Sequence, residues 1–121
     1  MKNEEILNTF GEILIKRAYD NHAGLVKHDL EDLKQTERFK HLFLNMTSVQ
    51  KLELERLSFE ILSGLLFDFL QVFEEHEEFK IVYEMGDKQV DLMTISEMLK
   101  AAPIIEGGWI DRFSQYSDKT K

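Results

Sequence analysis

The fold of this chain is decided by residues 47–78, which read TSVQKLELERLSFEILSGLLFDFLQVFEEHEE. The polar or small residues in this stretch recur at steps of three and four and form one narrow stripe: Arg56, Glu60, Gly64, Asp68, Gln71 and Glu75. A helix that is apolar around most of its circumference is typical of the inside of a bundle, with other elements packed against it. We therefore predict one long central helix, in which Leu62, Leu66 and Phe69 are buried.

The ends of this helix are also marked in the sequence. Thr47 is followed three residues later by Gln50, which is the spacing of a capping box that begins a helix. On the N-terminal side, the apolar spacing predicts a first helix capped by Asn3 and ended by Gly24. An irregular helical segment capped by Asp29 is expected to connect the two.

The period of the pattern changes after the central helix. Apolar and polar residues alternate over residues 79–83 and again near residues 90–92, on either side of a turn-like Met85-Gly86-Asp87-Lys88. This pattern predicts a small β-hairpin. Thr94 with Glu97 has capping-box spacing and predicts a short helix up to Pro103, and residues 109–116 follow as a last helix.

Length and composition favour one folded domain. The chain has 121 residues, is 43% hydrophobic and contains no cysteine, so disulfides and thiolate metal sites are excluded. We predict a single mainly α domain over residues 1–121: a helical bundle around one long central helix with a small appended β-hairpin, and a frayed tail at residues 117–121. The sequence shows no signal peptide and no apolar run long enough to span a bilayer, so we expect a cytoplasmic protein.

The charge is concentrated in one part of the chain. The formal net charge is −8, and residues 48–91 alone carry 11 acidic and 4 basic residues, an excess of −7. Such a field repels nucleic acid and anionic lipid and attracts basic partners. The ordinary alternative is that acidity only keeps a small protein soluble.

The densest acidic run follows the central helix, and its carboxylates are Glu74, Glu75, Glu77 and Glu78. Carboxylates beside His76 could hold a divalent metal, but consecutive helical residues point in all directions and do not converge on one ion. Glu37 and His41 share a helix face, which is common by chance. We therefore expect no metal and no cofactor, and we take the four glutamates as candidates for partner binding.

The second candidate surface is aromatic and consists of Trp109, Phe113 and Tyr116. These residues are spaced to lie on one side of the last helix. Aromatic residues at helical spacing are more often core than interface, although tryptophan and tyrosine are shared between the two. The sequence leaves both interpretations open.

The closing segment, Glu106 to Tyr116, reads EGGWIDRFSQY. It resembles the E-x-G-W-I-x-R-F-S-x-Y ending of a group of small, uncharacterised bacterial proteins, in which a helix rich in phenylalanine and acid precedes a hairpin. The resemblance covers about the last fifty residues. It implies a bacterial cytoplasmic protein and brings no activity or catalytic residue with it.

Three functions remain open from the sequence. The leading hypothesis is a non-enzymatic acidic module that binds another protein, such as an immunity or regulatory protein that binds a basic partner. The second is a small metal-dependent enzyme that uses His76, His41 and nearby carboxylates. The third is a structural homodimer with no external ligand.

Overall fold

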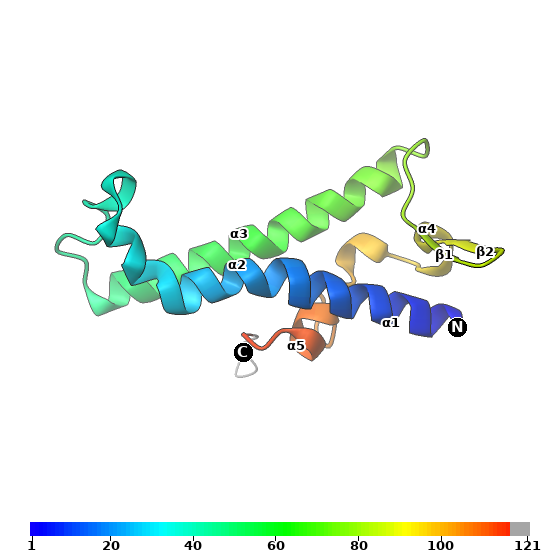
Figure 1. Cartoon of the computed structure of the whole chain (residues 1–121), viewed down its shortest axis with the longest axis horizontal. Coiled ribbons are helices and arrows are strands. Elements are labelled where there is room, and N and C mark those ends of the chain that lie inside the picture. The colour runs from blue at the N-terminus through cyan, green and yellow to red at the C-terminus, as the bar shows by residue number, and fades with distance from the viewer. Residues whose placement is uncertain (117–121) are drawn as a thin grey trace.

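The computed structural model describes residues 1–116, apart from the side chain of Glu31, and the predicted tail at residues 117–121 lies outside this range. The fold is mainly α, with one long central helix and one appended β-hairpin, as predicted. Two long helical segments meet at one end of the molecule and diverge toward the other, and the C-terminal part of the chain packs against both (Figure 1). Among the described residues, no helix combines the length and the apolar character needed to cross a membrane.

The N-terminal helical segment is longer and less regular than predicted. It contains α1 (Asn3–Leu14), a π-turn (Ile15–Tyr19), α2 (Asp20–Gly24) and a second π-turn (Leu25–Asp29). Two 3₁₀ pieces follow, Leu30–Gln35 and Glu37–Phe39. Two expectations are wrong here. Lys2 occupies the N-cap in place of Asn3 and makes no side-chain cap bond, and the chain passes through Gly24 with helical angles, φ −63° and ψ −39°.

The structure gives Gly24 a different role from helix termination. A Cβ atom at Gly24 would lie 2.9 Å from the hydroxyl oxygen of Tyr116. The missing side chain at residue 24 therefore makes room for the C-terminal segment.

The central helix, α3, runs from Ser48 to Glu75 without interruption at Gly64. The predicted capping box is confirmed: the Gln50 N–H donates to Thr47 Oγ1 at 3.1 Å, and the Thr47 N–H donates to Gln50 Oε1 at 2.8 Å. The helix ends three residues before Glu78, because His76 adopts an extended conformation.

The predicted burial of α3 is only partly correct. Leu66 and Leu70 are the two residues of α3 that are buried, and Leu62 is half-buried. Phe69, which was expected in the core, is 46% exposed. The helix is therefore covered on one side and not enclosed by a bundle.

The β-hairpin is confirmed and short. Strand β1 (Val82–Met85) pairs antiparallel with β2 (Lys88–Asp91), with Val82 opposite Asp91. Gly86 has φ +61° in the two-residue turn, a conformation that glycine adopts without steric cost. The Lys88 ammonium donates to the backbone oxygen of Met1 at 2.8 Å and ties the hairpin to the start of the chain.

The residues after the hairpin cap a helix differently from the prediction. Helix α4 (Leu92–Ile95) begins at Asp91, whose carboxylate accepts a hydrogen bond from the Met93 N–H at 3.0 Å. Thr94 lies inside this helix and donates to the Asp91 backbone oxygen, so the predicted Thr94 capping box is wrong. Asp91, at the end of β2, caps the helix three residues before Thr94, and Ser96 is the C-cap of the helix.

The last part of the chain closes the core. A 3₁₀ turn (Leu99–Ala101) packs on α3, and α5 (Trp109–Phe113) packs on α1 and the first π-turn. Helix α5 stops three residues before the predicted end at Tyr116, because Ser114 adopts an extended conformation. The buried core draws on all of these elements: Ile6, Ile15, Tyr19, Ala23, Leu66, Leu70, Leu92, Leu99 and Trp109.

Candidate protein-binding surface

The aromatic residues of the C-terminal segment belong to the core. Trp109 is only 3% exposed, and its ring meets Phe10 edge-on with centroids 5.8 Å apart. A Cβ atom at Gly11 would lie 2.5 Å from the indole ring, so the tryptophan occupies the space that the glycine leaves. Phe113 and Tyr116 are half-buried against the same core. This placement favours the core interpretation over a free binding surface.

A buried carboxylate holds the chain after α5. Asp20 is 7% exposed, its Oδ1 accepts a hydrogen bond from the Ser114 hydroxyl at 2.5 Å, and its Oδ2 accepts one from the Gln115 N–H at 3.1 Å. The Ser114 oxygen in turn accepts a bond from the Tyr116 N–H at 3.0 Å. No motif in the sequence marks Asp20, although it lies two heptads after Ile6 and therefore close to the buried face of the helix. The network fastens the two ends of the fold together.

Tyr19 joins the N-terminal segment to α3. Burial raises the pKa of its hydroxyl, the hydrogen bond with Ser63 lowers it in part, and the negative charge of Asp20 raises it further. A raised pKa keeps this tyrosine neutral at ordinary pH. Tyr19 therefore acts as a neutral hydrogen-bonding group between two helices.

The four candidate glutamates lie where the sequence predicted, at the exposed end of α3. Glu74 is 3.5 Å from the Lys100 ammonium, and Glu75 accepts a hydrogen bond from the Gln71 amide at 2.6 Å. Glu78 lies 3.4 Å from His76, and Glu77 is exposed beside it. These carboxylates surround the end of the helix and face water, so they form a charged surface without a shared centre.

The residues of the metal hypothesis lie far apart in one copy of the chain. His41 precedes α3 and His76 follows it, with 28 helical residues, roughly 42 Å at 1.5 Å per residue, between them. Among the side chains of residues 1–116 other than Glu31, no group of three or more histidine and acidic residues could hold a metal ion.

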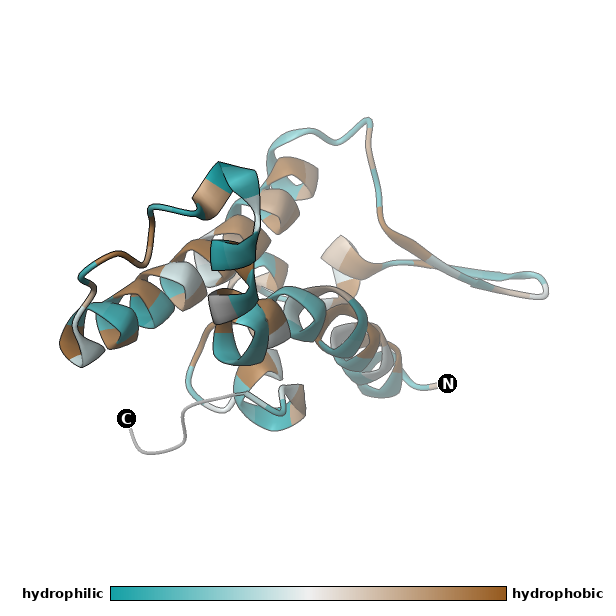
Figure 2. Cartoon of the chain, turned by 60° about the vertical axis from the view of Figure 1, so that its left-hand side comes forward, coloured by the Kyte–Doolittle hydropathy of each residue, from teal (hydrophilic) through white to brown (hydrophobic). Residues whose placement is uncertain are grey.

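The most unusual surface is an apolar face of α3. It consists of five large side chains, each between 45% and 63% exposed: Leu57, Ile61, Leu65, Phe69 and Val72. We call these five residues the α3 face. In Figure 1, no other element lies beyond α3 along the edge of the molecule that its C-terminal half forms. Figure 2 shows how closely hydrophobic positions follow one another along this helix.

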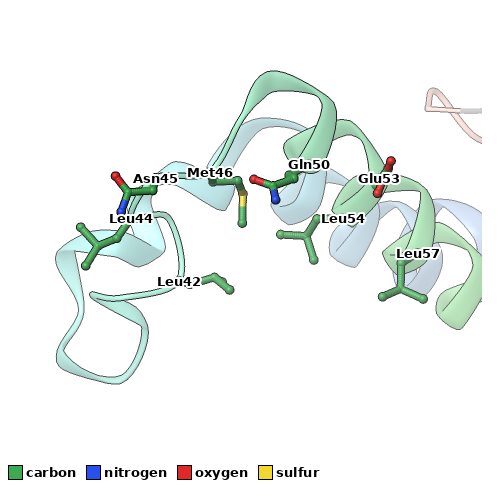
Figure 3. A pocket seen from close by; sticks show the side chains of 8 residues that line it. All are labelled: Leu42, Leu44, Asn45, Met46, Gln50, Glu53, Leu54 and Leu57. Atoms are coloured by element: carbon green, nitrogen blue, oxygen red, sulfur yellow. The ribbon is translucent and has the colours of Figure 1, made fainter.

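A hollow continues the α3 face at the N-terminal end of the helix. One side is lined by Leu42, Leu44 and Met46 of the segment before α3, and the other by Leu54 and Leu57. Leu42, Met46 and Leu54 point toward the same space in Figure 3, whereas Leu44 points away from it. The polar side chains of Asn45, Gln50 and Glu53 also line the hollow. The apolar surface therefore extends beyond α3 onto the connecting segment.

The α3 face is not marked by any motif in the sequence, although its five residues are all apolar. The sequence does indicate such a surface by number alone, because α3 carries more large apolar side chains than the rest of this 121-residue chain can bury. Comparison with known proteins gives no further assignment, because no family model, no curated protein and no solved structure matches this chain.

Proposed function

We propose that this protein is a non-enzymatic module that works by binding another protein chain through the α3 face. The observation that carries the proposal is the exposure of five large apolar side chains along one side of a single helix. Soluble monomers rarely expose contiguous apolar patches beyond a few hundred Å², and larger patches usually mark interaction sites.

The shape of the surface indicates the form of the partner. The α3 face is a narrow apolar strip on a straight helix, with polar residues such as Glu60 and Gln71 on its flank. A partner helix with its own apolar stripe fits such a strip, since helices pair through side chains at steps of three and four.

The acidic end of α3 adds a second property to the same surface. Glu74, Glu75, Glu77 and Glu78 are exposed and follow directly after Val72 and Phe73. Charges at the rim of an interface act mainly on the association rate and on the choice of partner. A basic partner, of the kind that an immunity or regulatory protein binds, is therefore the second candidate function.

Site-specific photocrosslinking in bacterial cells tests the proposal. A photoreactive amino acid at Leu65 should give discrete protein adducts, and the same amino acid at Ile13 of α1 should give far fewer. The two positions are comparable, since Leu65 is 63% and Ile13 is 56% exposed. Equal labelling at both positions, or none at either, would show that the α3 face is not a binding surface.

A further inference from the structure

We infer that the α3 face binds a second copy of this chain, with the two α3 helices packed antiparallel around a two-fold axis near Ser63. The inference rests on the proposed function, because it names the partner of the same surface. Three independent features of α3 support it: the spacing of the apolar residues, the environment of Gly64 and the distribution of charge.

The apolar spacing reads the same in both directions. The α3 face together with Leu54 falls at steps of three, four, four, four and three, over Leu54, Leu57, Ile61, Leu65, Phe69 and Val72. Residues at these steps lie on one side of a helix. Two antiparallel copies centred on Ser63 therefore place Ile61 opposite the partner's Leu65, Leu57 opposite the partner's Phe69, and Leu54 opposite the partner's Val72.

This register also gives the hollow an occupant. The hollow lies beside Leu54 and Leu57, which are the residues that face the partner's Val72 and the partner's Phe69. The hollow is lined by both apolar and polar side chains, and aromatic side chains that fill recesses are frequent anchors of protein interfaces. The exposed ring of Phe69 in each copy would then be covered by the other copy.

Gly64 lies beside the α3 face, level with the proposed axis. A glycine inside a helix costs about 0.5–1 kcal/mol relative to alanine, so its presence calls for a reason. In α1 and α2 the reason is visible, because Trp109 and Tyr116 occupy the space at Gly11 and Gly24. At Gly64 a Cβ atom would meet nothing within 4 Å. Gly64 is level with the proposed axis and lies on the polar stripe that flanks the α3 face, so the edge of the contact is free of a side chain there.

The charges along α3 favour the antiparallel orientation over the parallel one. Its C-terminal half and the residues after it carry Asp68, Glu74, Glu75, Glu77 and Glu78 and no basic residue up to Glu78. The N-terminal half of α3 carries Lys51 and Arg56 together with Glu53, Glu55 and Glu60, a net charge of −1 against −3 for the C-terminal half. Parallel helices would place one acidic end against the other, whereas the antiparallel register brings Lys51 level with the partner's Glu75.

The apolar strip of α3 supplies about half of the area that a standard interface uses on each partner. A helix of 28 residues is roughly 42 Å long, and a strip of that length and about 10 Å wide covers about 400 Å². A standard interface uses about 800 Å² on each partner. In the antiparallel register each hollow meets the C-terminal end of the partner's α3, so the contact area extends beyond the helical strip at both ends.

The oligomeric state of the purified protein is the first test. Sedimentation velocity from 1 to 100 µM should show a concentration-dependent species at twice the chain mass of 14.3 kDa. Ile61→Glu should weaken the association at least about a hundredfold, because a carboxylate would be buried in an apolar contact. Ile13→Glu is the matched control, since Ile13 and Ile61 are 56% and 59% exposed, and it should change the association less than threefold. A monomer at 100 µM, or equal effects of the two variants, would overturn the inference.

The orientation is tested with single cysteines, which are clean probes because the chain has none. A short bismaleimide reagent should link Leu57→Cys to Phe69→Cys in a mixture of the two variants, and should link neither variant to itself. Efficient self-linking of Leu57→Cys would indicate parallel helices and contradict the two-fold axis near Ser63. Both positions are exposed in the single chain, so we expect both variants to keep the fold. Circular dichroism of each variant checks this expectation.

The two proposals fail in different ways. If the purified chain stays monomeric while photocrosslinking at Leu65 links a different polypeptide, then the α3 face binds a foreign partner, and the second copy is the wrong occupant. If the chain is monomeric and Leu65 forms no adduct, both the proposed function and the inference fail.

Discussion

Gly11 in α1 and Gly64 in α3 both lie inside long helices, but the chain covers them differently. The ring of Trp109 occupies the space beside Gly11, whereas the space beside Gly64 is open. The same contrast extends over the two helical segments: α1 and the residues after it bury Ile6, Ile15, Tyr19 and Ala23, while α3 buries only Leu66 and Leu70. Apolar character alone therefore does not show whether the covering partner is in the same chain.

The largest expected effect is at the covered side of this comparison. Trp109→Ala should lower the free energy of unfolding by about 3–5 kcal/mol, because it empties the space over Gly11 and removes the ring contact with Phe10. The total for a domain is only about 5–15 kcal/mol, so urea unfolding should show a large shift. Ile105→Ala, at an exposed side chain nearby, is the control and should change the midpoint little. Similar midpoints for the two variants would place Trp109 outside the core.

Two neighbouring leucines separate the two sides of α3. Leu66→Ala should cost about 2–5 kcal/mol of folding free energy, since Leu66 is buried against the N-terminal segment. Leu65→Ala should cost less than about 0.5 kcal/mol when unfolding is measured at low micromolar concentration, where any self-association is weak. The difference between the two should shrink as the protein concentration rises, because Leu65 is then covered by the second copy. A constant difference at all concentrations would argue against that cover.

The carboxylate of Asp20 should matter more than an exposed carboxylate on α3. Asp20→Ala leaves the Ser114 hydroxyl and the Gln115 N–H without their acceptor, which costs about 1–3 kcal/mol. Asp68→Ala removes an exposed side chain and is expected to change stability by less than about 0.5 kcal/mol. Thermal unfolding of both variants compares their losses of stability. Equal melting temperatures would mean that the hydrogen bonds of Asp20 do not stabilise the fold.

The glycines themselves should respond with opposite signs. Gly64→Ala should raise the stability of the single chain by up to about 1 kcal/mol, because it improves helix propensity in open space. Gly11→Ala should lower stability by about 1–3 kcal/mol, because the new methyl group overlaps the indole of Trp109. Urea titrations at low concentration give both values. A destabilised Gly64→Ala chain would show that residue 64 has a neighbour within its own chain.

The smallest effect is expected in alkali and comes from Tyr19. Its folded pKa is raised above the unfolded value of about 10, so its contribution to stability is complete below pH 10. The contribution is lost as the pH rises from the unfolded pKa through the folded pKa, where the unfolded state releases the proton more readily. Tyr19→Phe should flatten the fall in melting temperature above pH 10. An unchanged alkaline slope in Tyr19→Phe would exclude this linkage.

Local signals in the sequence predicted the fold where the responsible contacts are local. The Thr47–Gln50 capping box and the Gly86-Asp87 turn depend on residues close in sequence, and both are present. Contacts between distant residues caused the errors. Gly24 accommodates Tyr116 and does not end a helix, and Asp91 begins α4 before Thr94 can.

The candidate site was harder to predict than the fold. The exposed glutamates could be predicted from composition, because charged side chains rarely enter a protein core. Phe69 and Leu65 are as apolar as Leu66 and Leu70, and the period of the helix cannot say which side the rest of the chain covers. Only the packing of the 3₁₀ turn at Leu99–Ala101 and of α2 on α3 decides that question.

The bond between Ser114 and Asp20 spans 94 residues of a 121-residue chain, and this separation affects how the protein is made. A ribosome adds about 5–20 residues per second, so roughly 5–19 s pass between the synthesis of the two partners. During that time the first helix has neither Trp109 over Gly11 nor a donor for the Asp20 carboxylate. A nascent chain that stalls before residue 109 therefore presents Ile6 and Ile15 to chaperones and proteases, and residues 109–116 complete the core.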